Sequence, residues 1–217
     1  MRSLGRLVRG LSALFWGLPA ALVICFHTAR SDGATSYGIL PPLVATAVLL
    51  YGLWSMGDFQ SQERVWRRAL DYAMLLALVN MGLSPFLYWW SRVPANMFFF
   101  AMTIAAIING LLFLGCLNIA LQRLGAMLPD EALRIEIRQF TALNLNMLGI
   151  TVMLVCGHLV LTRIRTVPLW LAVLERAIER GSFWFLILLV LLPLAMTMAL
   201  LWKTKEVILE SIFGTKR

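Results

Sequence analysis

The chain has 217 residues, of which 60% are hydrophobic and only 14% are charged, and its formal net charge is +8. Soluble domains are about half apolar and about a quarter charged, so this composition excludes an ordinary soluble globular protein. In a soluble protein such an excess of positive charge would suggest nucleic-acid binding. In a membrane protein it is explained by basic loops that lie beside anionic lipid headgroups. We therefore expect an integral membrane protein whose partner is the lipid bilayer, with no nucleic-acid partner.

The apolar residues collect into six stretches that are each long enough to cross roughly 30 Å of hydrocarbon at about 1.5 Å per helical residue. They lie at residues 11–28, 37–57, 71–90, 97–120, 143–162 and 182–202. The connectors are short, and no segment is left over for a soluble domain. The sequence therefore predicts a single polytopic membrane domain over residues 1–217. Its fold is an all-α integral membrane bundle of about six transmembrane helices with short loops and interfacial amphipathic helices.

Three connecting regions carry amphipathic patterns. Residues 168–180 place leucine and isoleucine on one helical stripe, which predicts an interfacial helix. Residues 58–71 are typical of a short amphipathic link. Pro129 and Glu131 open a further helix with acids in its first turn, and its continuation to Thr162 would make a single helix of about 51 Å that protrudes from the bilayer.

The basic residues indicate how the chain is oriented. If the first residue is cytoplasmic, six of the nineteen Lys and Arg lie outside and the other thirteen lie inside. Cytoplasmic connectors carry the excess of basic residues, so we expect both termini in the cytoplasm, with the chain in a bacterial plasma (inner) membrane. The six outer residues are Arg30, Arg92, Arg163, Arg165, Arg176 and Arg180. Four of them share the fifth connector, and if that connector is not external the number of spans changes.

Aromatic residues gather near the ends of the predicted spans, where Trp and Tyr prefer the headgroup level. The expected inner belt consists of Trp54, Trp66, Tyr72 and Trp202, and the expected outer belt of Tyr37, Tyr88, Trp89, Trp90, Trp170 and Trp184.

Charged residues are nearly absent from the predicted spans, the exception being Asp71 at the edge of the third. Charges at bilayer depth usually mark proton relays and ion sites, so this absence disfavours an ion-coupled transporter and a hydrolase that uses buried acids. The segment from Gly82 to Pro85 lacks the second glycine of a serine nucleophile motif, and no metalloprotease or CxxC motif occurs. No catalytic residue is predicted.

Asparagines are the polar side chains that do occur at depth. Asn80 and Asn109 fall at similar depths in the third and fourth spans, so they either bond each other or line a polar substrate site. Asn118, Asn144 and Asn146 share a depth nearer the cytoplasmic surface. We expect them to form interhelical hydrogen bonds, each worth about 0.6–2 kcal/mol.

Two histidines and three cysteines are the residues available for metal or redox chemistry. His27 and His158 fall in the same leaflet, and two facing imidazoles would be able to hold a haem, which is the one cofactor this pair suggests. The alternative is a hydrogen-bonded His158 and an interfacial His27, and on that reading no cofactor and no metal are predicted. The cysteines are odd in number and lie within spans, as expected of small apolar fillers.

Small residues recur at four-residue spacing in four of the predicted spans, including Ala73 with Ala77 and Ala195 with Ala199. Ala13, Gly17 and Ala21 form one row, and Ala106 and Gly110 form another. Such rows let two helix backbones approach closely, either within the chain or at an interface with other membrane protein subunits.

Three classes of function are compatible with these features. The first is a non-enzymatic polytopic membrane protein that serves as a subunit or scaffold of a membrane protein complex. The second is a small-molecule transporter or substrate-binding membrane subunit, with Asn80 and Asn109 in the cavity. The third is a membrane redox protein with haem between His27 and His158.

Overall fold

The computed structural model describes residues 2–30, 38–57, 59, 63–127, 131–161 and 189–210, and these residues form an all-helical protein. Six helices are present in this part of the chain. They are α1 (Arg2–Arg30), α2 (Leu40–Met56), α3 (Arg64–Arg92), α4 (Met97–Ala126), α5 (Glu131–Leu161) and a helix over residues 189–210.

Four of the described helices are long and apolar enough to cross a membrane. The qualifying stretches are Ser3–Arg30, Arg64–Arg92, Met97–Ala126 and Arg134–Gly157. Helix α2 is apolar as well, but its 17 residues make it shorter than these four.

Local chemistry explains where two of the helices begin. Helix α2 starts with Pro41 and Pro42, which suit a first turn because their missing N–H groups would have no partner there. Helix α4 starts after Asn96, whose side chain accepts a hydrogen bond of 2.9 Å from the Phe98 backbone N–H.

Helix α3 continues through Pro85. A proline inside a helix removes the N–H that would bond the carbonyl four residues earlier, which here belongs to Met81. The Ser84 hydroxyl donates to this carbonyl at 2.9 Å. The lost backbone bond is thus replaced by a neighbouring side chain, as apolar surroundings require.

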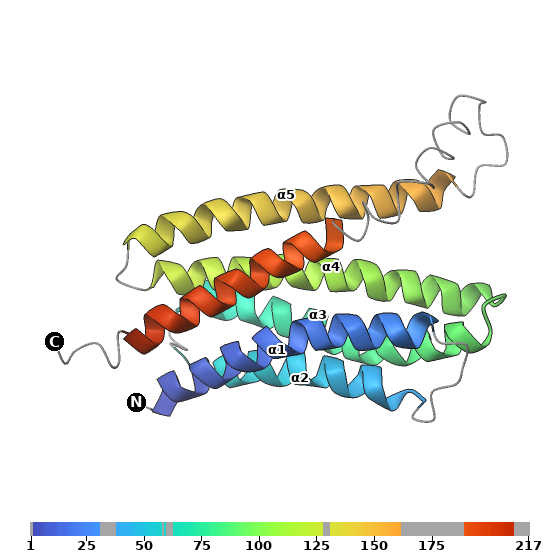
Figure 1. Ribbon diagram of the computed structural model, residues 1–217, viewed down its shortest axis with the longest axis horizontal. Helices are drawn as coiled ribbons and strands as arrows, with labels where there is room; N and C mark the ends of the chain where they lie inside the picture. Colours follow the sequence, from blue (N-terminus) through green and yellow to red (C-terminus); the bar gives the residue numbers. More distant parts are fainter. Residues whose placement is uncertain are drawn as a thin grey trace.

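The helices run alternately up and down the bundle, and consecutive helices from α1 to α5 pack side by side (Figure 1). Helix α1 also packs against α3. The 189–210 helix contacts α1 through Phe15 and Trp202, whose ring centroids are 5.5 Å apart, and contacts α5 through the ion pair of Lys203 with Glu136. Helix α1 begins, and the 189–210 helix ends, at the same end of the bundle, which we call the Arg2 end; the opposite one is the Arg30 end.

The densely packed core lies towards the Arg2 end. The largest fully buried side chains come from the first half of α1, the last turns of α2 and α4, and the start of α3 and α5. They are Leu7, Leu11, Leu14, Leu53, Met56, Trp66, Leu70, Leu117, Leu121, Leu124 and Ile137. The half of the bundle near the Arg30 end is packed less tightly, because it contains the cavity described below.

Glycines allow α1 and α2 to approach each other closely. A Cβ atom added at Gly10 would lie 2.6 Å from the Gly52 carbonyl oxygen, and one at Gly17 would lie 3.0 Å from a methyl group of Leu49. Ala21 is buried on the same helix, whereas Ala13 is only partly buried. Gly17 of the row read from the sequence therefore meets α2, but the tightest contact is at Gly10 and Gly52, outside that row.

Several helix boundaries differ from the predicted ones. The long helix that the sequence predicts to begin near Glu131 is present as the continuous helix α5. Residues 64–71 of the predicted amphipathic link are instead the first turns of α3, and the predicted sixth span is described from residue 189 and continues to residue 210. The predicted interfacial helix at residues 168–180 lies outside the described residues.

The assignment of Trp66 to an aromatic belt was wrong. Its ring is 1% exposed and its Nε1 donates to the Phe59 carbonyl at 3.0 Å, so it belongs to the core at the Arg2 end. By contrast, Trp54, Tyr72 and Trp202 are 70%, 63% and 53% exposed, as belt residues should be. Trp66 can be buried because its one polar group, the indole N–H, has a hydrogen-bond partner.

Candidate binding cavity

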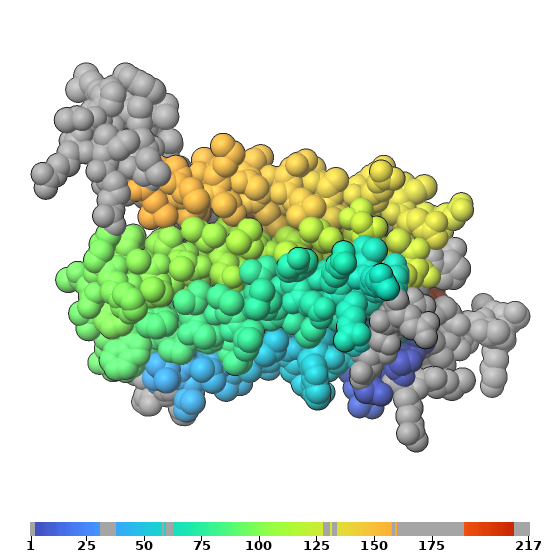
Figure 2. Space-filling model, turned by 180° about the vertical axis from the view of Figure 1, so that it is seen from behind, coloured from blue at the N-terminus to red at the C-terminus, as the bar shows by residue number. Residues whose placement is uncertain are grey.

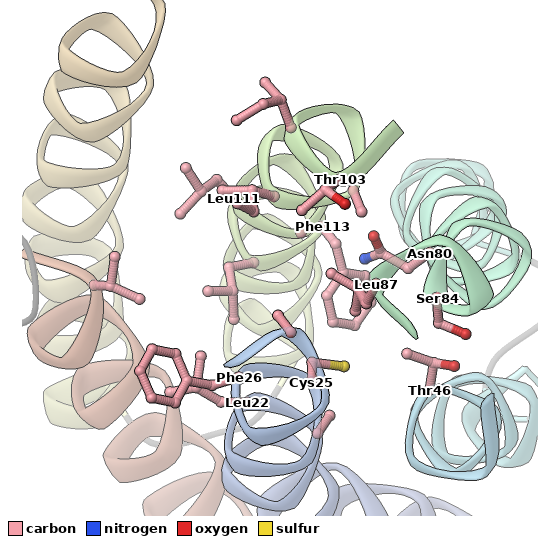
Figure 3. Close-up of a pocket in the computed structure, with 18 of the residues that line it drawn as sticks. Leu22, Cys25, Phe26, Thr46, Asn80, Ser84, Leu87, Thr103, Leu111 and Phe113 are labelled. Atoms are coloured by element: carbon pink, nitrogen blue, oxygen red, sulfur yellow. The ribbon is translucent and has the colours of Figure 1, made fainter. Parts of the chain in front are cut away.

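A cavity of about 560 Å³ lies in the half of the bundle near the Arg30 end (Figure 3). Its walls come from α1, α2, α3, α4 and the 189–210 helix. Helices α1 and α4 both border it, but within the described residues they do not pack directly against each other, so the cavity occupies the space between them. On α1 the lining runs from Leu18 to Arg30, which corresponds to a depth of about 18 Å along the helix axis.

Most of the lining is apolar, but two polar side chains in it lack hydrogen-bond partners. The Thr103 hydroxyl on α4 is unpaired although the residue is only 3% exposed, and the Asn80 amide on α3 makes no hydrogen bond in the described structure. Both side chains point into the space between α3 and α4 in Figure 3. An unpaired polar group in apolar surroundings costs about 1–3 kcal/mol, so these groups are ready to bond a molecule in the cavity.

The other hydroxyls of the lining are already paired with the backbone. Ser84 donates to the Met81 carbonyl, and Thr46 donates to the Pro42 carbonyl at 2.8 Å. Both bonds stay within the residue's own helix, so these two side chains keep at most acceptor capacity for a ligand.

Asn109, which the sequence paired with Asn80, does not line the cavity. Its amide nitrogen donates to the Leu76 carbonyl on α3 at 2.8 Å. Asn109 thus ties α4 to α3, and Asn80 is the member of the pair that remains available. Asn80 and Asn109 are not bonded to each other within the described structure.

Small side chains on α4 create the space beside Asn80. A Cβ atom added at Gly110 would meet only the Asn80 amide nitrogen, at 3.9 Å, so there is room for a larger group. Ala106 lines the cavity one turn earlier. The small-residue row of α4 thus borders empty volume, as does Ala21 of the α1 row, whereas Gly17 of the α1 row packs against α2.

A second polar cluster joins α4, α5 and the 189–210 helix outside the cavity. The Thr197 hydroxyl accepts from the Asn118 amide at 2.9 Å and from the Asn144 amide at 3.0 Å, and it donates to the Pro193 carbonyl at 2.7 Å. All three polar side chains are completely buried. Asn146 is exposed and does not join the cluster. It follows Asn144 by two positions, and residues two positions apart on a helix point to nearly opposite sides.

The histidines proposed as haem ligands lie on helices that do not pack together. His27 is exposed near the end of α1, and His158 lies in α5, where its side chain is outside the described part of the structure. Within that part, α5 packs against α4 and not against α1. The structure therefore gives no geometry for a haem between them.

Comparison of the chain with protein-family models, with curated proteins and with solved structures finds no match. The assignment of a function therefore depends on the geometry of the chain itself.

Thr103 is the cavity residue that the sequence did not single out. Threonine is ordinary in an apolar helix because its hydroxyl usually bonds the carbonyl four residues earlier. The sequence nevertheless contained one indication. Thr103, Ala106 and Gly110 are spaced three and four residues apart, so they lie on one face of α4.

Proposed function

We propose that this protein is an integral membrane protein of six spans that binds an elongated, largely apolar small molecule in the cavity between α1 and α4. This is the substrate-binding class of function, either a transporter or the binding subunit of one. The observation that carries it is a cavity of about 560 Å³ in which the buried Thr103 hydroxyl and the Asn80 amide have no partner. Ligand sites are typically apolar concavities with a few polar groups that orient the ligand.

Membrane insertion is supported by the surface of the bundle as well as by its long helices. Large apolar side chains such as Trp16, Val23, Leu75 and Met153 are 56–77% exposed along the helices, and a soluble protein rarely presents so much contiguous apolar surface. Figure 2 shows the long sides of the bundle formed by α3, α4 and α5. On the same proposal, the Arg2 end faces the cytoplasm of a bacterial cell, because the predicted topology assigns thirteen of the nineteen basic residues to that side.

The alternative, a subunit or scaffold of a membrane complex, has weaker support. The glycines of the small-residue rows already have places within the chain: Gly17 packs on Leu49, and Gly110 lies beside Asn80 in the cavity. A scaffold also has no need of a cavity with unpaired polar groups, each of which lowers its stability.

The proposal is tested by filling the cavity. Dodecanediol is a suitable probe because it is long, apolar in its middle and able to hydrogen-bond at its ends. We expect radiolabelled dodecanediol to bind the protein in phosphatidylcholine nanodiscs above its partition into empty nanodiscs, and the Gly110→Leu variant to lose this binding. Thr103→Val, which removes one hydroxyl at nearly constant volume, should weaken it about fivefold.

Gly82→Leu is the matched control, because Gly82 on α3 is exposed and nothing lies within 4 Å of an added Cβ. This variant adds the same side chain at the outer surface of the bundle and should bind the probe as the wild type does. Equal binding by Gly110→Leu and Gly82→Leu would show that the cavity is not the site.

A further inference from the structure

The two ends of the cavity differ in their chemistry. Its deep end is lined by Leu18, Leu49 and Leu194, all of which are buried. Its other end contains Arg30, the one charged side chain among the described residues of the lining. The Arg30 guanidinium carbon lies 6.0 Å from the centre of the Phe26 ring, which also lines the cavity, and Arg30 has no ion pair in the described structure.

The position of Arg30 places its charge where a lipid-like molecule carries its headgroup. Arg30 is the last residue of α1 and is exposed, so its guanidinium stays hydrated at the end of the bundle while the chain of lining residues runs inwards for about 18 Å. A guanidinium presents a planar set of donors that matches the oxygens of a carboxylate or phosphate.

From this arrangement we infer that the cavity takes an anionic amphiphile, with the anionic group bound by Arg30, the apolar chain along α1 and α4, and a polar group on the chain bonded to Thr103 and Asn80. The inference rests on the proposed function and names the class of its ligand. A long molecule is inferred because the lining residues of α1, from Leu18 to Arg30, cover about 18 Å along the helix axis.

Free-energy considerations favour polar recognition at this site. A hydrocarbon chain that leaves the bilayer for an apolar cavity gains little, because lipid tails are as apolar as leucine. Affinity for one amphiphile over the surrounding lipid must therefore come from groups that lipid tails cannot satisfy. Arg30, Thr103 and Asn80 are the lining groups of this kind.

The experiment compares two probes that differ only in charge at one end. ω-Hydroxylaurate carries a carboxylate and a distal hydroxyl, while dodecanediol has the same chain with two hydroxyls. In nanodiscs of zwitterionic phosphatidylcholine, we expect ω-hydroxylaurate to bind about tenfold more tightly than dodecanediol. The variant Arg30→Gln should lose this tenfold advantage and leave dodecanediol binding unchanged.

Arg92→Gln is the matched control. Arg92 ends α3 at the same end of the bundle, is exposed, and lies 5.4 Å from the Tyr88 ring, but it does not line the cavity. The Arg92→Gln variant should therefore bind both probes as the wild type does. Size-exclusion profiles should show that both arginine variants are folded. Equal affinity of the wild type for the two probes, or the same loss in both arginine variants, would overturn the inference.

The same measurements separate the inference from the proposed function. If dodecanediol binding depends on Gly110 but neither probe responds to Arg30→Gln, the cavity binds small molecules and the assignment of an anionic group is wrong. If neither probe responds to Gly110→Leu, the binding function itself is wrong.

Discussion

Thr197 is the residue through which three helices are joined. Its hydroxyl accepts hydrogen bonds from the amide nitrogens of Asn118 on α4 and Asn144 on α5. The amides also donate to the Leu114 and Pro193 carbonyls, at 2.8 and 3.2 Å. The side-chain oxygens of Asn118 and Asn144 have no partner in the described structure, so the two asparagines take part in the cluster only as hydrogen-bond donors.

We expect Thr197→Val to lower the free energy of unfolding by about 1–3 kcal/mol. The substitution keeps the shape of the side chain but removes the acceptor of two interhelical hydrogen bonds, each worth about 0.6–2 kcal/mol in a membrane. Reversible denaturation by dodecyl sulfate in mixed micelles measures the change.

Thr151→Val serves as the control for this prediction. Thr151 is also buried, at 1% exposure, but its hydroxyl donates only to the Met147 carbonyl of its own helix, at 2.8 Å. The loss of this bond frees a carbonyl that still has its backbone N–H partner, so the expected change is below about 0.5 kcal/mol. Equal effects of the two substitutions would contradict a joining role for Thr197.

At the scale of elements, the contact between α1 and α2 depends on glycine at the point of closest approach. The backbones of Gly10 and Gly52 lie so close that a Cβ on either residue would meet the other's carbonyl oxygen, at 2.6 and 3.2 Å. A backbone atom cannot rotate away as a side chain does, so the helices would have to separate.

Gly10→Ala is therefore expected to destabilise the protein by about 1–3 kcal/mol, as overpacking does. Gly5→Ala, on the same helix, adds its methyl group where nothing lies within 4 Å, and it should be neutral or slightly stabilising because alanine favours a helix more than glycine. Thermal unfolding in detergent compares the two variants. A stability change of the same sign in both would contradict the close contact.

At the scale of the whole molecule, six spans require both ends of the chain to lie on one side of the membrane. Helix α1 begins at the same end of the bundle at which the 189–210 helix ends, and the connection between α3 and α4 lies at the opposite end (Figure 1). The arrangement of the described helices is thus compatible with an even number of crossings.

The proposed six-span topology predicts which residues a membrane-impermeant thiol reagent reaches in sealed cells. In a variant without Cys25, Cys116 and Cys156, Ala95→Cys should be labelled from outside. Gly5→Cys and Glu210→Cys should be labelled only after the membrane is permeabilised. Labelling of Gly5→Cys and Glu210→Cys from different sides would contradict six spans.

The sequence by itself determined the helices, because hydrophobic runs, prolines and asparagine caps act locally. Runs of apolar residues and the uninterrupted course of α5 from Glu131 follow from the neighbours of each residue. Counting residues also placed Asn118, Asn144 and Asn146 at one depth, but it did not show that Asn146 is exposed while the other two are buried.

Only the tertiary structure decided which polar residues meet and which line empty space. Asn80 and Asn109 look alike in the sequence, yet rotation of α3 against α4 pairs Asn109 with a backbone carbonyl and leaves Asn80 in the cavity. Thr197 and Thr103 both stand in apolar helices, but the first joins three helices and the second is buried without a partner in the described structure. The physical reason is that helix rotation and spacing are set by packing between distant segments, such as the contact of Gly10 with Gly52, which no local pattern records.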